Sequence, residues 1–439
     1  MKGIERLHSS ASCFKQQGAA LILLAALLLL VTTATFFTYF DSSQYKIERE
    51  RRTLEALVDA KTALIGWSVA HPQYPGILPF PDRSSDGDYD GNSDCVSTAM
   101  LGYPHLLGKF PHVSQTAPCV GPAIGIASDA IDGYGERLWY AVSRNLVRTS
   151  IVPGSLVINP GIADAPTYPW LIVRDKQGAI ISSRVAAVII APGLPVGAQD
   201  RLGGLAGPVA YLDTVTISGS TYSNADSTVP NEDFIMAEDM QHVSPAHPIY
   251  QQPYEFNDRL IYITIDELIA ALESRAIREA ANALSAYYTA SAAVAGSRFF
   301  PYAAVLGDVG NLCEEGRLQG GMPINNIASS CTHSNPGLST LPNWFTESRW
   351  QDYFYYVISA DCTFAMPGCA VGGITVGTQT NQHALLISAG APLAGQARPS
   401  NNIADYLDSA ENANGDNVFD AVRTPLTPIY NDRMLIVAP

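Results

Sequence analysis

The chain carries little positive charge. Of its 439 residues only 26 are Lys or Arg, against 41 Asp or Glu, which gives a formal net charge of −15 at pH 7. Binding to nucleic acid needs a surplus of clustered Lys and Arg that face the phosphates, and the sequence offers no such cluster. We therefore expect no nucleic acid among the partners of this protein.

The motifs of common enzymes and of transition-metal sites are also missing. The sequence contains no GxSxG nucleophile elbow, no P-loop, no GxGxxG, no CxxC pair and no HExxH spacing. Each of these motifs places a nucleophile, a phosphate cradle or a set of metal ligands at a fixed spacing. Their absence favours a protein that is not an enzyme.

One stretch near the start lacks charge altogether. Residues 19–40, AALILLAALLLLVTTATFFTYF, form an apolar run that as a helix would be about 33 Å long, enough for a bilayer core of about 30 Å. Three basic residues and one acidic residue precede it, so the positive-inside rule places residues 1–18 in the cytoplasm. We expect a transmembrane helix over residues 19–45 and an extracytoplasmic body.

An ordinary secretory signal peptide is the alternative. Its apolar region usually runs about 7 to 15 residues and ends at a small-x-small cleavage site. The run in this sequence is longer and ends in aromatic residues, among them Phe36, Phe37 and Phe40. These differences favour a helix that stays on the chain.

The junction in front of the apolar run has a particular form. In KQQGAALILLAALLLL, the single Gly18 stands between a polar, basic leader and the apolar residues that begin at Ala19. This arrangement resembles the class III signal of type IV pilins and pseudopilins. The resemblance implies that a prepilin peptidase cuts between Gly18 and Ala19, that the new N-terminus is methylated, and that the helix binds other pilins or pseudopilins.

The implied fifth position of the mature chain departs from the family pattern. Most members have Glu there, whereas this sequence has Leu23. The same absence occurs in minor pilins and in the tip pseudopilin of type II secretion. The resemblance therefore implies a minor subunit at or near the tip of a type IV pilus or type II secretion filament, with a single pass through the bacterial inner membrane and a head in the periplasm or on the extracellular filament. A free-standing, membrane-anchored surface binding or adhesion protein is the alternative.

A second helical pattern follows the apolar run. Over residues 46–70 apolar side chains recur with a spacing of three and four, and charged residues occupy the first turns. Neither Gly nor Pro occurs between Ala19 and Ile65. We expect one continuous helix through both segments.

The rest of the sequence repeats itself. Four segments of the first half return in the same order in the second half, which indicates an internal duplication. The pairs are Ala63–Pro81 with Ala283–Pro301, Gly135–Ser143 with Gln351–Ser359, Val188–Arg201 with Leu385–Arg398, and Phe256–Leu260 with Tyr430–Met434. We expect two homologous modules, residues 46–264 and 265–439, the second entered by its own helix over 265–295.

Each module also contains β-rich runs separated by Gly, Pro, Asn and Asp. They span 137–142, 170–173, 185–191 and 260–265, and then 353–358, 384–389 and 434–437. A helix packed on an antiparallel sheet is an α+β arrangement, and the resemblance implies the same for a pilin head. We expect an α+β fold in which the N-terminal transmembrane helix continues into a long helix on an antiparallel sheet, followed by a second pilin-like module.

The most distinctive local motif is an acidic loop, DGDYDGNSD. Its oxygen-bearing side chains are Asp86, Asp88, Asp90, Asn92 and Asp94. Oxygen ligands at positions 1, 3, 5 and 9, with Gly at position 6, suit a hard cation wrapped by a short loop, so the pattern predicts calcium. Ser97 stands where an EF-hand has its bidentate Glu, so Asp82 or a remote residue would complete the shell. A solvated acidic turn is the alternative.

The sequence has seven cysteines, of which Cys13 lies in the leader. Six remain, an even number that favours disulfides in an oxidising compartment. Proximity and module boundaries favour three pairs, although six cysteines allow fifteen connectivities. The pairs are Cys95 with Cys119, Cys313 with Cys331, and Cys362 with Cys369.

Overall fold

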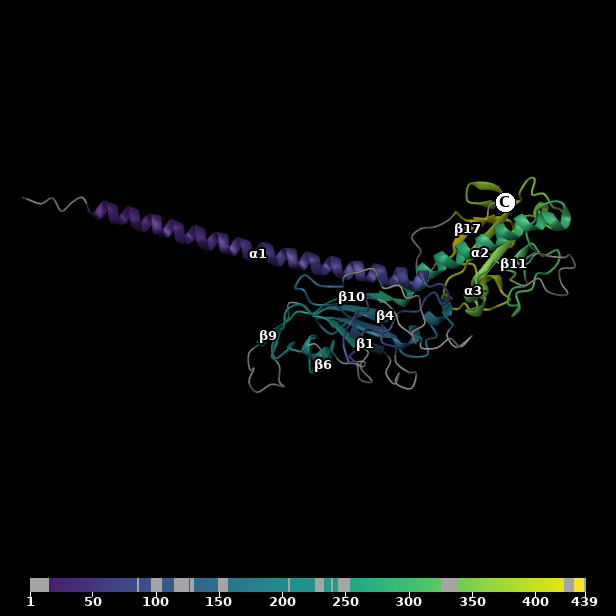
Figure 1. Cartoon of the computed structure of the whole chain (residues 1–439). Coiled ribbons are helices and arrows are strands. Elements are labelled where there is room, and N and C mark those ends of the chain that lie inside the picture. The colour runs from purple at the N-terminus through teal and green to yellow at the C-terminus, as the bar shows by residue number, and fades with distance from the viewer. Residues whose placement is uncertain are drawn as a thin grey trace, which may run out of the picture.

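The computed structural model of the chain describes most of its length. The described residues are 16–84, 87–95, 105–113, 126, 130–148, 157–203, 206–225, 233–237, 240–243, 253–324, 338, 340–421 and 430–437. A long helix extends from a body built of sheets and a second long helix (Figure 1).

The first helix, α1 (Gln16–Ala70), has 55 residues. Its N-terminal part projects from the body as a rod, and its C-terminal part lies over the first sheet (Figure 1). Leu57, Ala60 and Leu64 are buried there, one helical turn apart, because these positions face the sheet. The continuity predicted across residues 19–70 is present in this helix.

The membrane-spanning part of the prediction, residues 19–45, is wrong. Among the residues that the structure describes, none of the helices is long and apolar enough to cross a membrane. The described apolar side chains of this part of α1, from Leu21 to Val31, are exposed. Thr32 and Thr33 follow, with hydroxyls that donate to backbone carbonyls of the preceding turn. The predicted single-pass inner-membrane localisation is corrected with it, and the membrane as a partner stays a prediction.

A six-stranded sheet forms the first half of the body. Its strands are β1 (His105–Lys109), β2 (Trp139–Ser143), β4 (Ile180–Ala191), β3 (Leu171–Asp175) and β7 (Asp233–Met236) in this order, and β10 (Arg259–Thr264) also pairs with β4. Every residue of β2 is buried, because α1 covers one face of the sheet and a separate apolar cluster covers the other.

The second half begins with α2 (Ile265–Ala295) and carries a four-stranded sheet. The strands are β11 (Gln319–Gly321), β12 (Phe354–Ile358), β15 (Ala384–Ser388) and β17 (Arg433–Val437), in this order. α2 lies along this sheet and contacts both β15 and β17 (Figure 1).

The central strands of the two sheets pair in the same antiparallel register. A middle-strand isoleucine lies between an aromatic residue on one side and an apolar residue on the other. These residues are Ile190 between Trp139 and Leu260 in the first sheet, and Ile387 between Tyr355 and Met434 in the second. The aligned positions are those that the sequence echoes equate.

The expected fold class is corrected, because the structure is mixed α/β with several sheets. Parallel neighbours occur in both halves, where β3 pairs with β7 and β13 (Ile374–Val376) pairs with β16 (Val418–Phe419). Parallel strands need a crossover connection, so the body is not one antiparallel sheet per module. The smaller elements are β14 (Gln379–Gln382) beside β13, the hairpins β5 (Thr214–Ile217) with β6 (Ser220–Ser223) and β8 (Met240–Val243) with β9 (Pro253–Phe256), the helix α3 (Asn343–Glu347), and 3-10 turns at Arg144–Leu146, Pro160–Ala163, Pro208–Ala210, Trp350–Tyr353, Ala360–Cys362 and Ile403–Asp405.

The two halves meet without a linker. β10 ends at Thr264, whose hydroxyl accepts a hydrogen bond from Glu267 N and so caps the start of α2. Lys61 of α1 donates to Tyr262 O (2.9 Å) and lies 2.8 Å from the Glu267 carboxylate. One hydrophobic core includes side chains from α1, α2 and both large sheets. The predicted boundary at 264/265 therefore falls at a strand-to-helix junction inside a shared core.

Two glycines allow backbones to approach closely at equivalent places. A Cβ on Gly108 would lie 2.3 Å from Asp82 O, and one on Gly320 would lie 2.1 Å from Ala304 O. We expect Gly320→Ala to lower the free energy of unfolding by about 1–3 kcal/mol, because the methyl group must displace a backbone carbonyl. Gly66→Ala, on α1 with open space around the Cβ, should instead raise it by about 0.5–1 kcal/mol. Urea unfolding checks both, and equal effects of the two substitutions would contradict this account.

Candidate functional site

A largely buried arginine, Arg201, bonds the loops that follow β4 in the first sheet. The Arg201 side chain is only 7% exposed and donates to Gly193 O (2.7 Å) and to Gln199 Oε1 (2.9 Å). Its guanidinium lies 4.9 Å from the centre of the Tyr211 ring. Gln199 in turn donates to Asp213 Oδ1 (2.8 Å). We call Arg201, Gln199, Asp213, Asn257 and Asp258 the Arg201 network.

Each of the two carboxylates of this network accepts a backbone N–H from the segment that carries the other. Asp213 N donates to Asp258 Oδ2 (2.8 Å), and Asn257 N donates to Asp213 Oδ2 (2.8 Å). Burial raises the pKa of both carboxyls, and the neighbouring Asp213 charge raises that of Asp258 further. The pair therefore favours one protonated carboxyl over two negative charges.

The second half contains the same arrangement. Arg398 donates to Gly390 O and to Gln396 Oε1 (2.8 Å), Gln396 donates to Asp408 Oδ1 (3.0 Å), and Asp408 N donates to Asp432 Oδ2 (2.9 Å). Burial first, and then the Asp408 charge, raises the pKa of Asp432 to about 7. We call Arg398, Gln396, Asp408, Asn431 and Asp432 the Arg398 network. In both networks the arginine donates to backbone carbonyls and a glutamine, and Arg201 also pairs with Glu136 (3.1 Å), so these partners hold the loops together and occupy the guanidinium groups.

The acidic loop is only partly within the described residues, and Asp86 lies outside them. Asp90 Oδ1 accepts a hydrogen bond from Asn92 N (2.8 Å), and Asp94 accepts one from Arg83 N. Across the described part of the loop, the carboxylates of Asp88, Asp90 and Asp94 are not gathered closely enough to share one ion. The structure thus brings no calcium shell together from these residues.

Asp82, the expected extra ligand, faces a cation of the protein itself. Its Oδ2 accepts from Arg137 Nη2 (2.8 Å) and from Gly91 N (2.8 Å), and its side chain is 1% exposed. Burial raises the pKa of Asp82, while Arg137 and Gly91 lower it. Calcium binding by the acidic loop stays a prediction that the described geometry does not support.

Tyr89 fixes the middle of the acidic loop to the body. The Lys109 ammonium lies 4.5 Å from the centre of the Tyr89 ring and 4.8 Å from that of Tyr211. Tyr89 also meets the Trp139 ring edge-on at 6.0 Å. Burial lowers the pKa of Lys109, and the nearby Arg137 charge lowers it further. The loop is therefore attached to the first sheet by stacking around a buried lysine.

One of the three predicted disulfides is present, between Cys362 and Cys369. Cys95 and Cys313 are disulfide-bonded as well. Their predicted partners, Cys119 and Cys331, lie outside the described residues, so these two pairings stay predictions.

The predicted cleavage site falls within the first turns of α1. Gly18 and Ala19 are helical, but their side chains are outside the described set, as are residues 1–15 altogether. Cleavage between them stays a prediction.

The projecting part of α1 carries consecutive exposed apolar side chains. Each is between 53% and 72% exposed, far above the exposure of a core residue. They are Leu21, Ile22, Leu23, Leu24, Leu27, Leu28, Leu29, Leu30 and Val31. Such a patch marks a surface that another apolar surface covers.

No family model, no curated protein and no solved structure matches this chain.

Two parts of the described chemistry were missed by reading the sequence. His383 lies close in space to the Cys362–Cys369 disulfide. Its distance from the two cysteines along the sequence matches no familiar spacing of metal ligands. Asp213 is part of the Arg201 network and Asp408 is part of the Arg398 network. A single Asp in a loop gives no sequence signal of that role. The repeated Gln and Arg at the ends of two echoed segments, Val188–Arg201 and Leu385–Arg398, were the available clue.

Proposed function

We propose that this chain is a pilin-like subunit of a filament and binds its neighbours through the exposed apolar part of α1. The role is assembly rather than catalysis. The single observation that supports it most is the set of exposed apolar residues from Leu21 to Val31 on a helix that projects from the body (Figure 1).

The distribution of these residues favours several neighbours over one. Positions 21–24 and 27–31 are exposed and apolar, and successive helical residues point about 100° apart, so the apolar surface surrounds the helix. A helix that is apolar on all sides is buried on all sides. A single partner helix would cover one stripe, whereas a bundle of like helices in a filament covers the whole circumference.

The burial of these side chains supplies the driving force for assembly. Fully burying one Leu or Ile side chain contributes about 1.5–3 kcal/mol, so the nine exposed residues together provide ample stabilisation for a helical bundle. Past this segment α1 becomes charged, with Arg51 bonded to Glu48 and Glu55. The charged turns separate the packing segment from the body, which can then stand outside the bundle.

Leu23 supports a minor subunit over a major one. The resemblance to pilins places an acid at this position in most members, and here the side chain is an exposed Leu. A subunit without the acid suits the tip, where no further subunit needs its partner. We propose that a prepilin peptidase prepares this chain by cutting between Gly18 and Ala19.

The experiment combines mass spectrometry with filament shearing in the cells that make the protein. We expect a mature N-terminus at Ala19 and recovery of the protein with sheared filaments. Leu27→Lys should reduce that recovery at least about tenfold, because a buried unpaired charge costs several kcal/mol. Leu202→Lys, at a 91% exposed position away from α1, is the matched control and should leave recovery unchanged.

Two results would sink the proposal. One is retention of residues 1–18 on the mature protein. The other is equal recovery of Leu27→Lys and Leu202→Lys. A free-standing surface binding protein predicts a mature chain that begins at Ala19 but does not sediment with filaments.

A further inference from the structure

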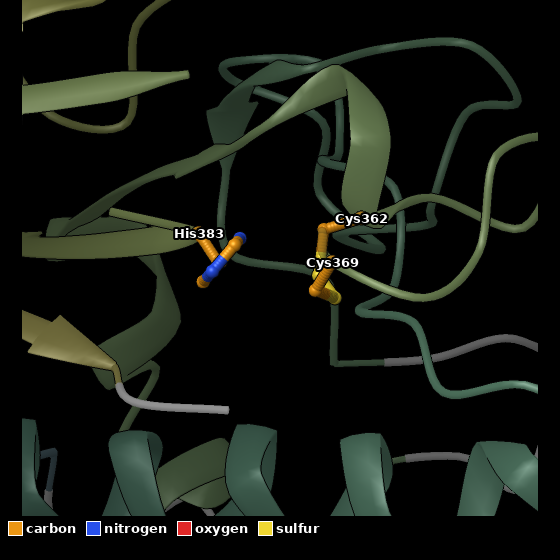
Figure 2. Close-up of side chains that lie close together, drawn as sticks. All are labelled: Cys362, Cys369 and His383. Carbon is orange, nitrogen blue, oxygen red and sulfur yellow. A yellow bond between two sulfur atoms is a disulfide. The ribbon is translucent and has the colours of Figure 1, made fainter. Parts of the chain in front are cut away.

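Three potential metal ligands converge in the second half of the body. Cys362 ends the 3-10 turn after β12, Cys369 lies in the following loop, and His383 directly precedes β15. Their ligand atoms all lie within 4.8 Å of one another, and no other group of three His, Cys, Asp or Glu in the described ranges does so. Figure 2 shows the imidazole of His383 on the opposite side of a small gap from the two sulfurs.

The imidazole itself points to a ligand. His383 Nδ1 is buried and has no hydrogen-bond partner among the described residues. A buried polar atom without a partner costs about 1–3 kcal/mol, so such an atom in a native protein calls for an explanation. A metal ion bound to the ring would provide one, because neutral imidazole is a common ligand of transition metals.

Hydrogen bonds hold this loop in place independently of the disulfide. Cys369 N donates to Asp361 O (3.1 Å), and the Asp361 carboxylate accepts from Val371 N (2.7 Å) and Gly372 N (3.0 Å). Cys362 N donates to the carbonyl of the residue three positions earlier. The two cysteines therefore stay close to each other and to His383 when the bond between their sulfurs is broken.

We propose that Cys362, Cys369 and His383 form a zinc site in the reduced protein, in exchange for the disulfide. A dithiol reductant supplies two electrons and two protons, which convert the disulfide into two thiols. Zinc then binds both sulfurs as thiolates and releases two protons, while the imidazole binds through a neutral nitrogen. Two thiolates and an imidazole favour zinc over calcium or magnesium, which prefer oxygen ligands.

The distances suit this exchange. Zn–S bonds of about 2.3 Å and a Zn–N bond of about 2.0–2.1 Å at tetrahedral angles place the ligand atoms about 3.5–3.8 Å apart. The ligand atoms already lie within 4.8 Å, so zinc needs only a small separation of the sulfurs. The Asp361 carboxylate already accepts hydrogen bonds from two backbone N–H groups, so the fourth position is left to water or to an added ligand.

With the zinc site, the loop has a different cross-link in each redox state. Zinc would hold residues 362–383 together before oxidation, and the disulfide would do so afterwards. The proposal is independent of the filament role, since it concerns the other end of the molecule from the apolar part of α1 (Figure 1).

The test uses the full-length protein and cobalt(II) as a spectroscopic substitute for zinc. After anaerobic reduction and removal of the reductant, we expect one equivalent of cobalt to give sulfur-to-metal charge-transfer absorption, and one equivalent of zinc to remove it. The oxidised protein should give no such absorption. Cys362→Ser with Cys369→Ser should abolish the signal, which separates this site from the other cysteines.

His383→Gln should weaken metal binding at least about tenfold, because one of three protein ligands is lost. His112→Gln, in the first half of the body, is the matched control and should bind as the unaltered protein does. Circular dichroism checks that the variants are folded, and the comparison of reduced with oxidised unaltered protein needs no variant. The proposal is wrong if the reduced protein shows no charge-transfer absorption, or if the signal persists without Cys362 and Cys369.

Discussion

Replacement of Arg398 by Met should lower the free energy of unfolding by about 3–5 kcal/mol at pH 7. The guanidinium donates to Gly390 O, Asp405 O (2.6 Å) and Gln396 Oε1 (2.8 Å), and a methionine side chain has no donor for any of these acceptors. Its charge also offsets that of the buried Asp432 carboxyl. Loss of one member of a buried charged network typically costs this much, because the partners stay buried without compensation.

Equilibrium unfolding in urea, followed by circular dichroism, measures the loss. Arg317→Met is the matched control, because Arg317 pairs with Glu314 at the surface, where both side chains are more than a third exposed. An exposed pair contributes less than about 1 kcal/mol. If the two variants unfolded at the same urea concentration, the Arg398 network would not have the stabilising role assigned to it.

The protein should lose stability as the pH rises from 5 to 8. Burial raises the pKa of Asp432 to about 7, and burial also raises that of Glu273 to about 7 although Arg433 opposes the shift. In the unfolded chain both carboxyls ionise near pH 4. Between these values the native state holds more protons than the unfolded state. The stability that these two groups contribute is therefore complete below about pH 4 and is lost as the pH rises through about 7, by up to about 3–4 kcal/mol for each group.

Asp432→Asn isolates one of these groups. The amide oxygen can still accept the hydrogen bond from Asp408 N (2.9 Å), but the side chain no longer ionises. We expect the slope of unfolding free energy against pH, measured between pH 5 and 8, to fall by up to about 1.4 kcal/mol per unit. Asp59→Asn, at an exposed position on α1, should leave the slope unchanged. An unaltered slope in Asp432→Asn would show that this carboxyl is ionised throughout.

Much of the central architecture could be predicted from the sequence, for a physical reason. α2 spans the predicted residues 265–295, and the runs predicted at 185–191, 353–358 and 434–437 overlap β4, β12 and β17. β12 and residues 185–191 of β4 are fully buried and β17 is partly buried, so burial constrains their apolar and β-branched composition. The same constraint preserves the echoes between the two halves.

Two of the remaining elements, β14 and β16, were missed because burial constrains them little. β14 reads QTNQ and is mostly exposed, and β16 has only two residues, so neither carries a hydrophobic pattern. Their pairing is determined by the loops that join them. The Cys362–Cys369 proximity was visible in the sequence, but His383 reaches the pair only because β15 begins beside it. The excess apolar run at the N-terminus was read as a bilayer span because length and hydropathy alone do not separate membrane packing from helix packing.

The direct passage of β10 into α2 has a mechanical consequence. Thr264 is both the last residue of β10 and the N-cap of α2. No loop therefore separates the strand of the first half from the helix of the second. A pull transmitted along α1 reaches the first sheet through Leu57 and Leu64, and continues through β10 and α2 into the second sheet. If the proposed filament is placed under load, the two halves of the body would thus move together. A force on the second sheet would then be transmitted to α1.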